Sequence, residues 1–318
     1  MLIIDGFGHI MPGRFLEELL KTYPTLESKE LRALAYLGDM KKKIKDLDEH
    51  KIDKQVLCIA RPSIWLNMPD DEAERLNIMA NDAVAEAAAD YPGRFFPVGH
   101  IALPTEKSLR EVDRCINKLG MAGIHVVSNI NGKPLDSPEF RPFWARMNET
   151  KTAVWLHPQV QGDTNEFVID KTYGWLYETS VALTRLVFSG IMHEYPDLRI
   201  ITHHMGGMLP HFSERIKGFY EARSMFPRSN FAFTPEDPLV YFRKFYGDMV
   251  LNGSLHALEC GYKFFGPKQI VFATDYPFGP RQGVEWMEGS LRTLEQVDLP
   301  QAEKEMIASG NILRLLER

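Results

Sequence analysis

The residues best suited to chemistry are histidines and acids that fall at the ends of short apolar segments. They are Asp5 and His9, His100, His125, His157, the pair His203 and His204, and Asp275. Imidazole rings and a carboxylate that meet at one place form a ligand set for a divalent cation, and such a cation lowers the pKa of a bound water. A single histidine in an apolar strand is normally a hydrogen-bonded core residue. Histidines at several strand ends therefore favour a metal-centred site.

These residues need strands to position them, and the sequence supplies a repeating unit of an apolar segment followed by a longer amphipathic stretch. We expect strands over 2–5, 55–60, 95–101, 123–127, 152–157, 198–203, 245–250 and 269–274. Several are continuous apolar runs, as in parallel strands buried on both faces. The pattern predicts one domain over 1–318, a distorted (β/α)8 TIM barrel. An open doubly wound sheet fits less well, because no glycine-rich phosphate motif follows the first strand.

In such a barrel the carboxyl ends of the strands meet at one mouth, where active sites are built. We expect the first strand to end at Asp5, with His9 just beyond it. The stretches 22–45 and 221–243 are longer than ordinary connections and are predicted to form extra helices or loops over this mouth.

Composition narrows the classes of partner. The net charge is −6, which disfavours nucleic acid, and the lysine-rich segment 41–45 is predicted to be a solvated helix face. The chain has no apolar run of about 18 residues, so no membrane span is expected. Cys58, Cys115 and Cys260 lack metal-like spacing and indicate reduced thiols in a cytoplasmic protein. The apolar helical stretch 174–196 suggests a homo-oligomer, and we expect a dimer.

Five motifs carry a family likeness. They are DGFGHIMP, VWLHPQ, ITHHMGGMLP, FATDYPFG and SGNILRLL, and the likeness extends from residue 2 to about residue 316. In this order they resemble the amidohydrolase superfamily. More narrowly, they resemble its decarboxylase branch, which includes aminocarboxymuconate semialdehyde decarboxylase and γ-resorcylate decarboxylase.

The resemblance implies roles for particular positions. It places metal ligands at His9, His157 and Asp275, and gives Asp275 an acid–base role as well. It places a proton carrier at His204, beside the metal. His203, just before that motif, is either a partly buried strand residue or a direct participant.

Five further residues are predicted to bind substrate. Phe7 stands where the family has the first histidine of a His-x-His pair, and a phenyl ring cannot bind a metal. It would instead form an apolar wall. Arg61 is placed to bind a substrate carboxylate, with a surface ion pair as the alternative. Trp65, Tyr276 and Phe278 would line the pocket, or would serve only in packing.

The resulting expectation is a metal-dependent, non-oxidative decarboxylase of an aromatic or unsaturated carboxylic acid. His204 or a protonated Asp275 would deliver the proton, and zinc is the expected metal, with manganese as the alternative. The same residues could serve a hydrolase or hydratase acting on a lactone, amide, C–C diketone or alkene, with Asp275 as base. A third possibility is a barrel that has lost its metal and binds a small acid without catalysis.

Overall fold

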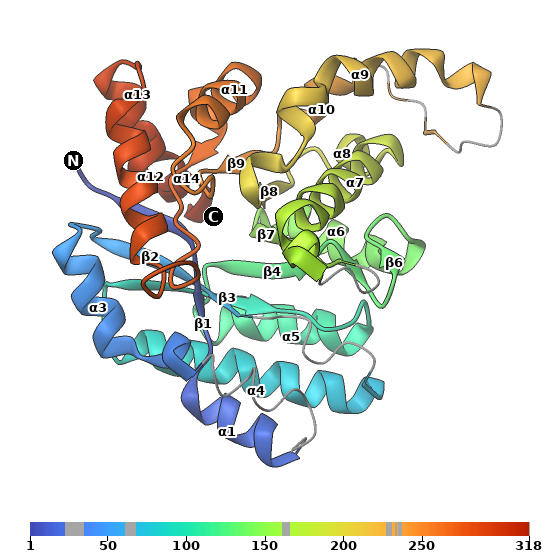
Figure 1. Cartoon of the computed structure of the whole chain (residues 1–318). Helices are drawn as coiled ribbons and strands as arrows, with labels where there is room; N and C mark the ends of the chain where they lie inside the picture. The colour runs from blue at the N-terminus through green and yellow to red at the C-terminus, as the bar shows by residue number, and fades with distance from the viewer. Residues whose placement is uncertain are drawn as a thin grey trace.

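Eight parallel strands form a barrel in the order β1-β2-β3-β4-β7-β8-β9-β10 (Figure 1). The computed structural model describes residues 1–22, 35–60, 68–160, 166–226, 231–232, 234 and 237–317. The strands are β1 (Ile4–Ile10), β2 (Lys54–Ile59), β3 (Phe95–His100), β4 (Gly123–Val127), β7 (Ala153–His157), β8 (Arg199–Thr202), β9 (Tyr246–Asp248) and β10 (Ile270–Val271). A short antiparallel pair, β5 (Asn129–Ile130) and β6 (Lys133–Pro134), follows β4.

Backbone hydrogen bonds between β1 and the segment after β10 close the circle. The Gly6 amide donates to the Phe272 carbonyl (2.8 Å), the Asp275 amide donates to the Phe7 carbonyl (3.1 Å), and the His9 amide donates to the Tyr276 carbonyl (2.8 Å). The predicted (β/α)8 barrel is therefore confirmed. Closure also places the chain around Asp275 directly beside β1.

Helices surround the strands, and α1, α4 and α5 pack side by side (Figure 1). The described helices are α1 (Gly13–Thr22), α3 (Met40–Glu49), α4 (Asp70–Ala89), α5 (Glu106–Asn117), α6 (Arg141–Thr150), α7 (Trp175–Phe188), α8 (Ile191–Glu194), α9 (Leu209–Glu221), α10 (Pro238–Phe242), α11 (Leu255–Phe265), α12 (Val284–Gln296), α13 (Gln301–Glu305) and α14 (Asn311–Leu316). Of the long stretches 22–45 and 221–243, the parts at 35–38, 40–45, 222–225 and 238–242 are helical, whereas 23–34, 227–230, 233 and 235–236 lie outside the described residues. None of the described helices combines the length and apolar character needed to cross a bilayer.

The first strand differs from its prediction. It continues past Asp5 to Ile10, and its register against β2 shifts between Asp5 and Gly8. Glycine is required at position 8, because a Cβ atom there would lie 2.4 Å from the side chain of Gln55. His9 is therefore a fully buried residue of the strand, not a residue of the loop beyond it.

The lysine-rich start of α3 also departs from prediction. Lys41 and Lys45 are exposed, as expected of a solvated face, but Lys43 is buried with 1% of its surface accessible. The helix begins after Asp39, whose carboxylate accepts a hydrogen bond from the Lys42 amide (2.9 Å). This start orients Lys43 toward the barrel.

Candidate metal centre

Three histidines and one aspartate meet inside the barrel. His9 comes from β1, His157 ends β7, His203 follows β8, and Asp275 lies just after β10. One ring nitrogen from each histidine lies within 4.8 Å of the others, and His203, His204 and Asp275 form a second group of the same size. Asp275 Oδ1 lies 3.0 Å from His9 Nε2 and 3.5 Å from His203 Nε2. Residues nearly 270 positions apart thus surround one point.

His203 is oriented by a buried carboxylate. Its Nδ1 lies 2.5 Å from Asp248 Oδ2 on β9, and Asp248 Oδ1 accepts hydrogen bonds from the amides of Met205 (3.3 Å) and Val250 (3.1 Å). This leaves Nε2 directed at the cluster. Metal-binding histidines characteristically donate their other ring nitrogen to a carboxylate or carbonyl, as His203 does here.

His157 has the same kind of support. Its Nδ1 lies 2.7 Å from the carbonyl oxygen of Pro158, so Nδ1 carries the proton and Nε2 keeps its lone pair. Burial lowers the pKa of His157, and the neighbouring His203 lowers it further. His157 is therefore neutral, which is the form that binds a metal.

The cluster leaves buried nitrogens without hydrogen-bond partners. Among the described residues these include both ring nitrogens of His9 and Nε2 of His203. Burying a polar atom without a partner costs free energy, so such atoms are normally satisfied by protein, water or an ion. Imidazole nitrogens with a carboxylate suit a divalent cation, and the residues present therefore fit a metal.

The charges of the cluster follow from its neighbours. Burial opposes ionisation of Asp275, but the adjacent rings of His203 and His9 outweigh it and hold its pKa below the usual range. Burial lowers the pKa of His203, yet Asp248 and Asp275 outweigh it and raise the pKa to about 9. Asp275 is therefore a carboxylate here, in contrast to the protonated group expected of a dry site.

The backbone at Asp275 is unusual. Its φ angle is 63°, in the left-handed region that costs free energy for any residue with a side chain. Hydrogen bonds on both sides hold it, since its amide donates to the Phe7 carbonyl and its carbonyl accepts from the Phe278 amide (2.9 Å). Strain of this kind is concentrated at functional sites.

Phe7 lies against the cluster and is completely buried. Its ring centroid is 4.2 Å from that of His203, 5.4 Å from His9, 6.0 Å from His125 and 6.3 Å from His157. The predicted apolar wall is thus in position, although its role toward a substrate stays a prediction.

The other predicted substrate residues differ in where they lie. Phe278 is partly buried, with its ring 5.2 Å from that of His9. Tyr276 is buried and faces α3, where its hydroxyl donates to Asp46 (2.6 Å), a contact of the packing kind given as the alternative. Arg61 and Trp65 lie outside the described residues.

Two further aromatic side chains lie at the site, and one of them, Trp175, was not among the residues expected from the sequence. Trp175, the first residue of α7, stacks on His204 at 5.9 Å and contacts His157 edge-on at 5.7 Å. His125 lies 5.8 Å from His157, ring to ring. The position of Trp175 carries no signal in the sequence, because it lies inside an apolar helical pattern.

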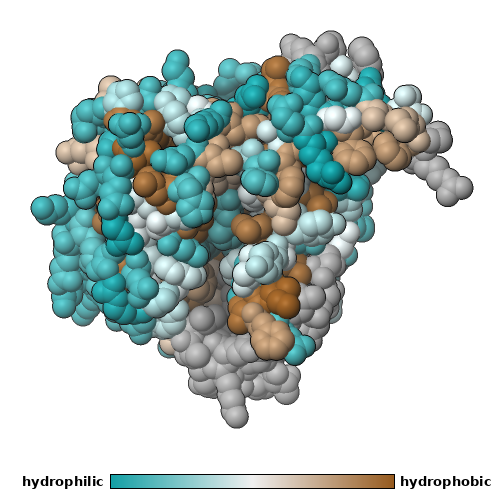
Figure 2. All heavy atoms as spheres, turned by 45° about the horizontal axis from the view of Figure 1, so that its top comes forward, coloured by the Kyte–Doolittle hydropathy of each residue, from teal (hydrophilic) through white to brown (hydrophobic). Residues whose placement is uncertain are grey.

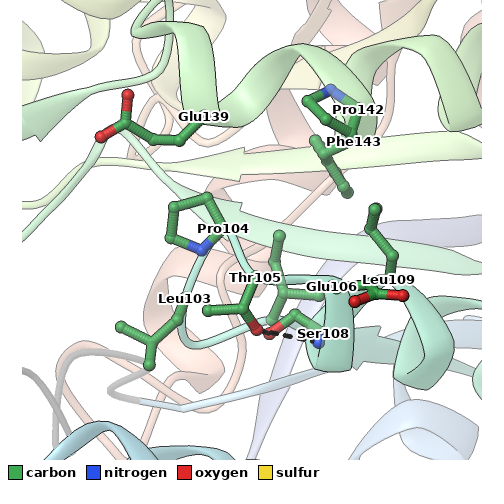
Figure 3. Close-up of a pocket in the computed structure, with 10 residues that line it drawn as sticks. Leu103, Pro104, Thr105, Glu106, Ser108, Leu109, Glu139, Pro142 and Phe143 are labelled. Carbon is green, nitrogen blue, oxygen red and sulfur yellow. Dashed lines mark hydrogen bonds between the residues drawn. The ribbon is translucent and has the colours of Figure 1, made fainter.

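A cavity of about 300 Å³ lies apart from these residues, between the segment after β3, the start of α5 and the start of α6 (Figure 3). Its lining is largely apolar, from Leu103, Pro104 and Phe143, with the carboxylates of Glu106 and Glu139 at the edge. The lining includes none of the clustered histidines, so the chemistry belongs to the cluster and not to this cavity.

Comparison with known proteins agrees with the fold. A family model described as amidohydrolase matches residues 64–318, and the chain therefore belongs to this family. The 2-amino-3-carboxymuconate-6-semialdehyde decarboxylase of Dictyostelium discoideum is 29% identical over 279 residues, covering 86% of this chain and 75% of the relative. The gamma-resorcylate decarboxylase of Polaromonas sp. JS666 is 28% identical over 315 residues, covering 93% of this chain and 91% of the relative.

Solved structures show the same likeness. Dihydroxybenzoic acid decarboxylase from Polaromonas sp. JS666, with bound manganese and 2-nitroresorcinol, superposes with a TM-score of 0.83 at 25% identity, covering 99% of this chain and 97% of that one. 5-Carboxyvanillate decarboxylase from Sphingomonas paucimobilis gives a TM-score of 0.84 at 23% identity, covering 99% of this chain and 98% of that one. The predicted resemblance to the decarboxylase branch is confirmed.

Proposed function

We propose that this protein is a metal-dependent, non-oxidative decarboxylase of an aromatic or unsaturated carboxylic acid. The observation that carries the proposal is the group of buried imidazoles around an ionised carboxylate inside the barrel. The relatives reported above are all named as decarboxylases of such acids, which supports this reaction over hydrolysis or hydration.

His9, His157 and Asp275 would hold the metal, as expected from the sequence. We add His203 as a fourth ligand, because its Nε2 faces Asp275 Oδ1 at 3.5 Å while Asp248 fixes its other nitrogen. Its raised pKa means that a bound cation would replace a proton on Nε2. A bound divalent cation would supply positive charge to the substrate's carboxylate and its neighbouring oxygen. Zinc was expected; manganese is bound in the structure from Polaromonas, so both metals belong in the test.

Loss of CO2 requires a proton on the carbon that carried the carboxylate. His204 is the candidate to deliver it, because it lies beside the cluster and is not needed as a metal ligand. Burial and the neighbouring His203 lower the pKa of His204, so His204, like the ionised Asp275, must take up a proton before it can deliver one. The His204 ring is partly exposed and is held between Trp175, stacked at 5.9 Å, and His203 at 3.9 Å. Phe7 and Phe278 would exclude water from this carbon.

The experiment measures CO2 from a panel of hydroxybenzoates and carboxymuconate-type acids, with Mn²⁺ or Zn²⁺ supplied, in D2O. The proposal expects CO2 and product in equal amounts, with one deuterium where the carboxylate was attached. His204→Gln should lower the rate by about 100-fold or more, whereas the control His256→Gln, at an exposed histidine, should not. Solvent oxygen in the product would instead indicate hydrolysis or hydration. The absence of turnover by folded, metal-loaded protein would favour the non-catalytic barrel.

We also propose that the protein is a cytoplasmic homodimer. Large apolar side chains near the start of α7 support an oligomer, since Phe167 is 81%, Tyr173 63% and Tyr177 57% exposed. Apolar groups also break up an otherwise hydrophilic face in Figure 2. Sedimentation velocity measures the assembly directly, and a monomer at micromolar concentration would contradict it.

A further inference from the structure

Lys43 is a buried cation that the proposed reaction does not use. It lies on α3 with 1% of its surface accessible, and its Nζ donates to the His9 carbonyl (3.0 Å) and to Gln55 Oε1 (3.2 Å). Its Nζ also lies 4.4 Å from the ring centroid of Tyr276. The ammonium group therefore contacts the backbone of β1 and the side chain of Tyr276, just beyond Asp275.

Hydrogen bonds continue from Lys43 to the closure of the barrel. Gln55 Nε2 donates to Asp5 Oδ2 (2.6 Å), which also accepts from the hydroxyl of Thr274 (2.5 Å). Asp5 Oδ1 accepts from the amides of Thr274 (3.0 Å) and Phe7 (3.2 Å). We call Asp5, Lys43, Gln55 and Thr274 the rear network. It joins the strand that carries His9 to the segment that carries Asp275.

The rear network is costly to bury. Burial lowers the pKa of Lys43 to about 7, although Asp5 and Asp46 partly oppose this, and burial raises the pKa of Asp5 to about 6. An apolar side chain at position 43 would fill the space without that penalty. The absence of a side chain at Gly8 leaves the space that the Gln55 side chain occupies. Both Gly8 and Gln55 are therefore needed for the hydrogen bonds of the rear network.

We propose that Lys43 is a positioning residue for the metal centre. Through the His9 carbonyl, Gln55 and Asp5, it fixes β1 against the segment after β10. His9 Nε2 and Asp275 Oδ1 are thereby held 3.0 Å apart, ready to share one cation. This inference rests on the proposed metal site. It means that a residue of α3, which supplies no ligand, controls the distance between the ligands His9 and Asp275.

The test is Mn²⁺ binding by metal-free protein, followed by electron paramagnetic resonance of the free and bound ion. Lys43→Met removes the donors while keeping most of the volume, and the matched control is Lys45→Met on the exposed face of the same helix. We expect folded Lys43→Met to bind Mn²⁺ about 10 to 100-fold more weakly than the parent, with an altered spectrum of the bound ion. Lys45→Met should bind like the parent.

A purely structural role for Lys43 would lower the unfolding temperature but leave the affinity and the spectrum of the folded protein unchanged. Parent-like affinity of folded Lys43→Met overturns the proposal. A second variant, Gln55→Met, keeps Lys43 but breaks its link to Asp5, and we expect weaker Mn²⁺ binding there too. If Lys43→Met does not fold, parent-like affinity of Gln55→Met overturns the proposal. Failure of the parent itself to bind Mn²⁺ or Zn²⁺ would instead refute the proposed metal site.

Discussion

The rear network and the histidine cluster are two sets of buried polar side chains that both include residues of β1, and they differ in how completely their polar atoms are hydrogen-bonded. In the rear network, the side-chain oxygens and nitrogens of Asp5, Lys43, Gln55 and Thr274 are all hydrogen-bonded. In the histidine cluster, the ring nitrogens of His9 and the Nε2 of His203 have no hydrogen-bond partner in the described part of the chain.

The difference separates two uses of buried polarity. A fully bonded network stabilises one arrangement of the backbone, because breaking any member leaves the others unsatisfied. Nitrogens without partners cost free energy until a ligand completes them. The rear network is therefore expected to govern stability and geometry, and the histidine cluster to govern metal binding and catalysis.

The largest effect is expected from Asp275→Asn, which removes the only carboxylate that lies close to both His9 and His203 within the described cluster. Mn²⁺ affinity should fall by more than about 100-fold, beyond the loss typical of a residue that only supports a ligand. CO2 release should become undetectable. Equilibrium dialysis and a CO2 assay measure the two effects, with the exposed Asp298→Asn as control. Undiminished Mn²⁺ binding would remove Asp275 from the ligand set.

Phe7→Ala should mainly affect stability. The ring is fully buried among histidines, so its removal leaves a cavity and should lower the free energy of unfolding by about 3–5 kcal/mol. Urea unfolding of metal-free protein measures this, with Phe226→Ala, at a 41% exposed position, as control. A loss below about 1 kcal/mol would mean that the ring packs loosely and could move for a substrate.

Phe7→His separates packing from metal binding. An added imidazole beside His203 should raise Mn²⁺ affinity, but it removes the apolar wall and should slow CO2 release. Titration and turnover, measured on the same preparation, give both values. An increase in both would show that Phe7 has no part in the substrate pocket.

The lowered pKa of Lys43 should make the free energy of unfolding depend on pH. Its pKa in the folded protein is about 7, below the ordinary lysine value of 10.5, so the unfolded chain binds more protons between these values. Stability therefore rises with pH across this window, by at most about 1.4 kcal/mol per pH unit. Asp5, Asp46, Lys42 and Tyr276 are the other titratable groups nearby.

The measurement is urea unfolding of metal-free parent and Lys43→Met at pH 7, 8 and 9. The free energy of the parent, minus that of the variant, should increase with pH. A difference that stays flat or decreases would mean that Lys43 keeps an ordinary pKa in the folded protein.

The smallest effect is expected at Trp175. An aromatic contact contributes about 0.5–1.5 kcal/mol, so Trp175→Leu should slow CO2 release by roughly 2 to 12-fold while leaving Mn²⁺ affinity unchanged. Tyr177→Leu, at an exposed position of the same helix, is the control. Loss of Mn²⁺ binding in Trp175→Leu would show that the stack on His204 supports the ligands and not the proton transfer.

Much of this arrangement was predictable from the sequence. Continuous apolar segments separated by amphipathic stretches specify a barrel, and a barrel brings His9, His157 and Asp275 together because its strand ends meet. The rear network was not predictable. Lys43 lies among other lysines, and its burial depends on contacts with β1 and β2 that only the folded barrel creates. The left-handed backbone at Asp275 and the contact of Trp175 with His204 likewise depend on long-range packing.

The central claim is that the histidine cluster exists to bind a metal, and the most direct measurement is metal content. Protein purified without chelator is analysed by elemental mass spectrometry beside His157→Ala, with folding of both verified by circular dichroism. The account predicts about one divalent cation per chain in the parent, and little or none in the variant. Folded parent that releases CO2 without metal, or a variant that retains the full metal content, would contradict it.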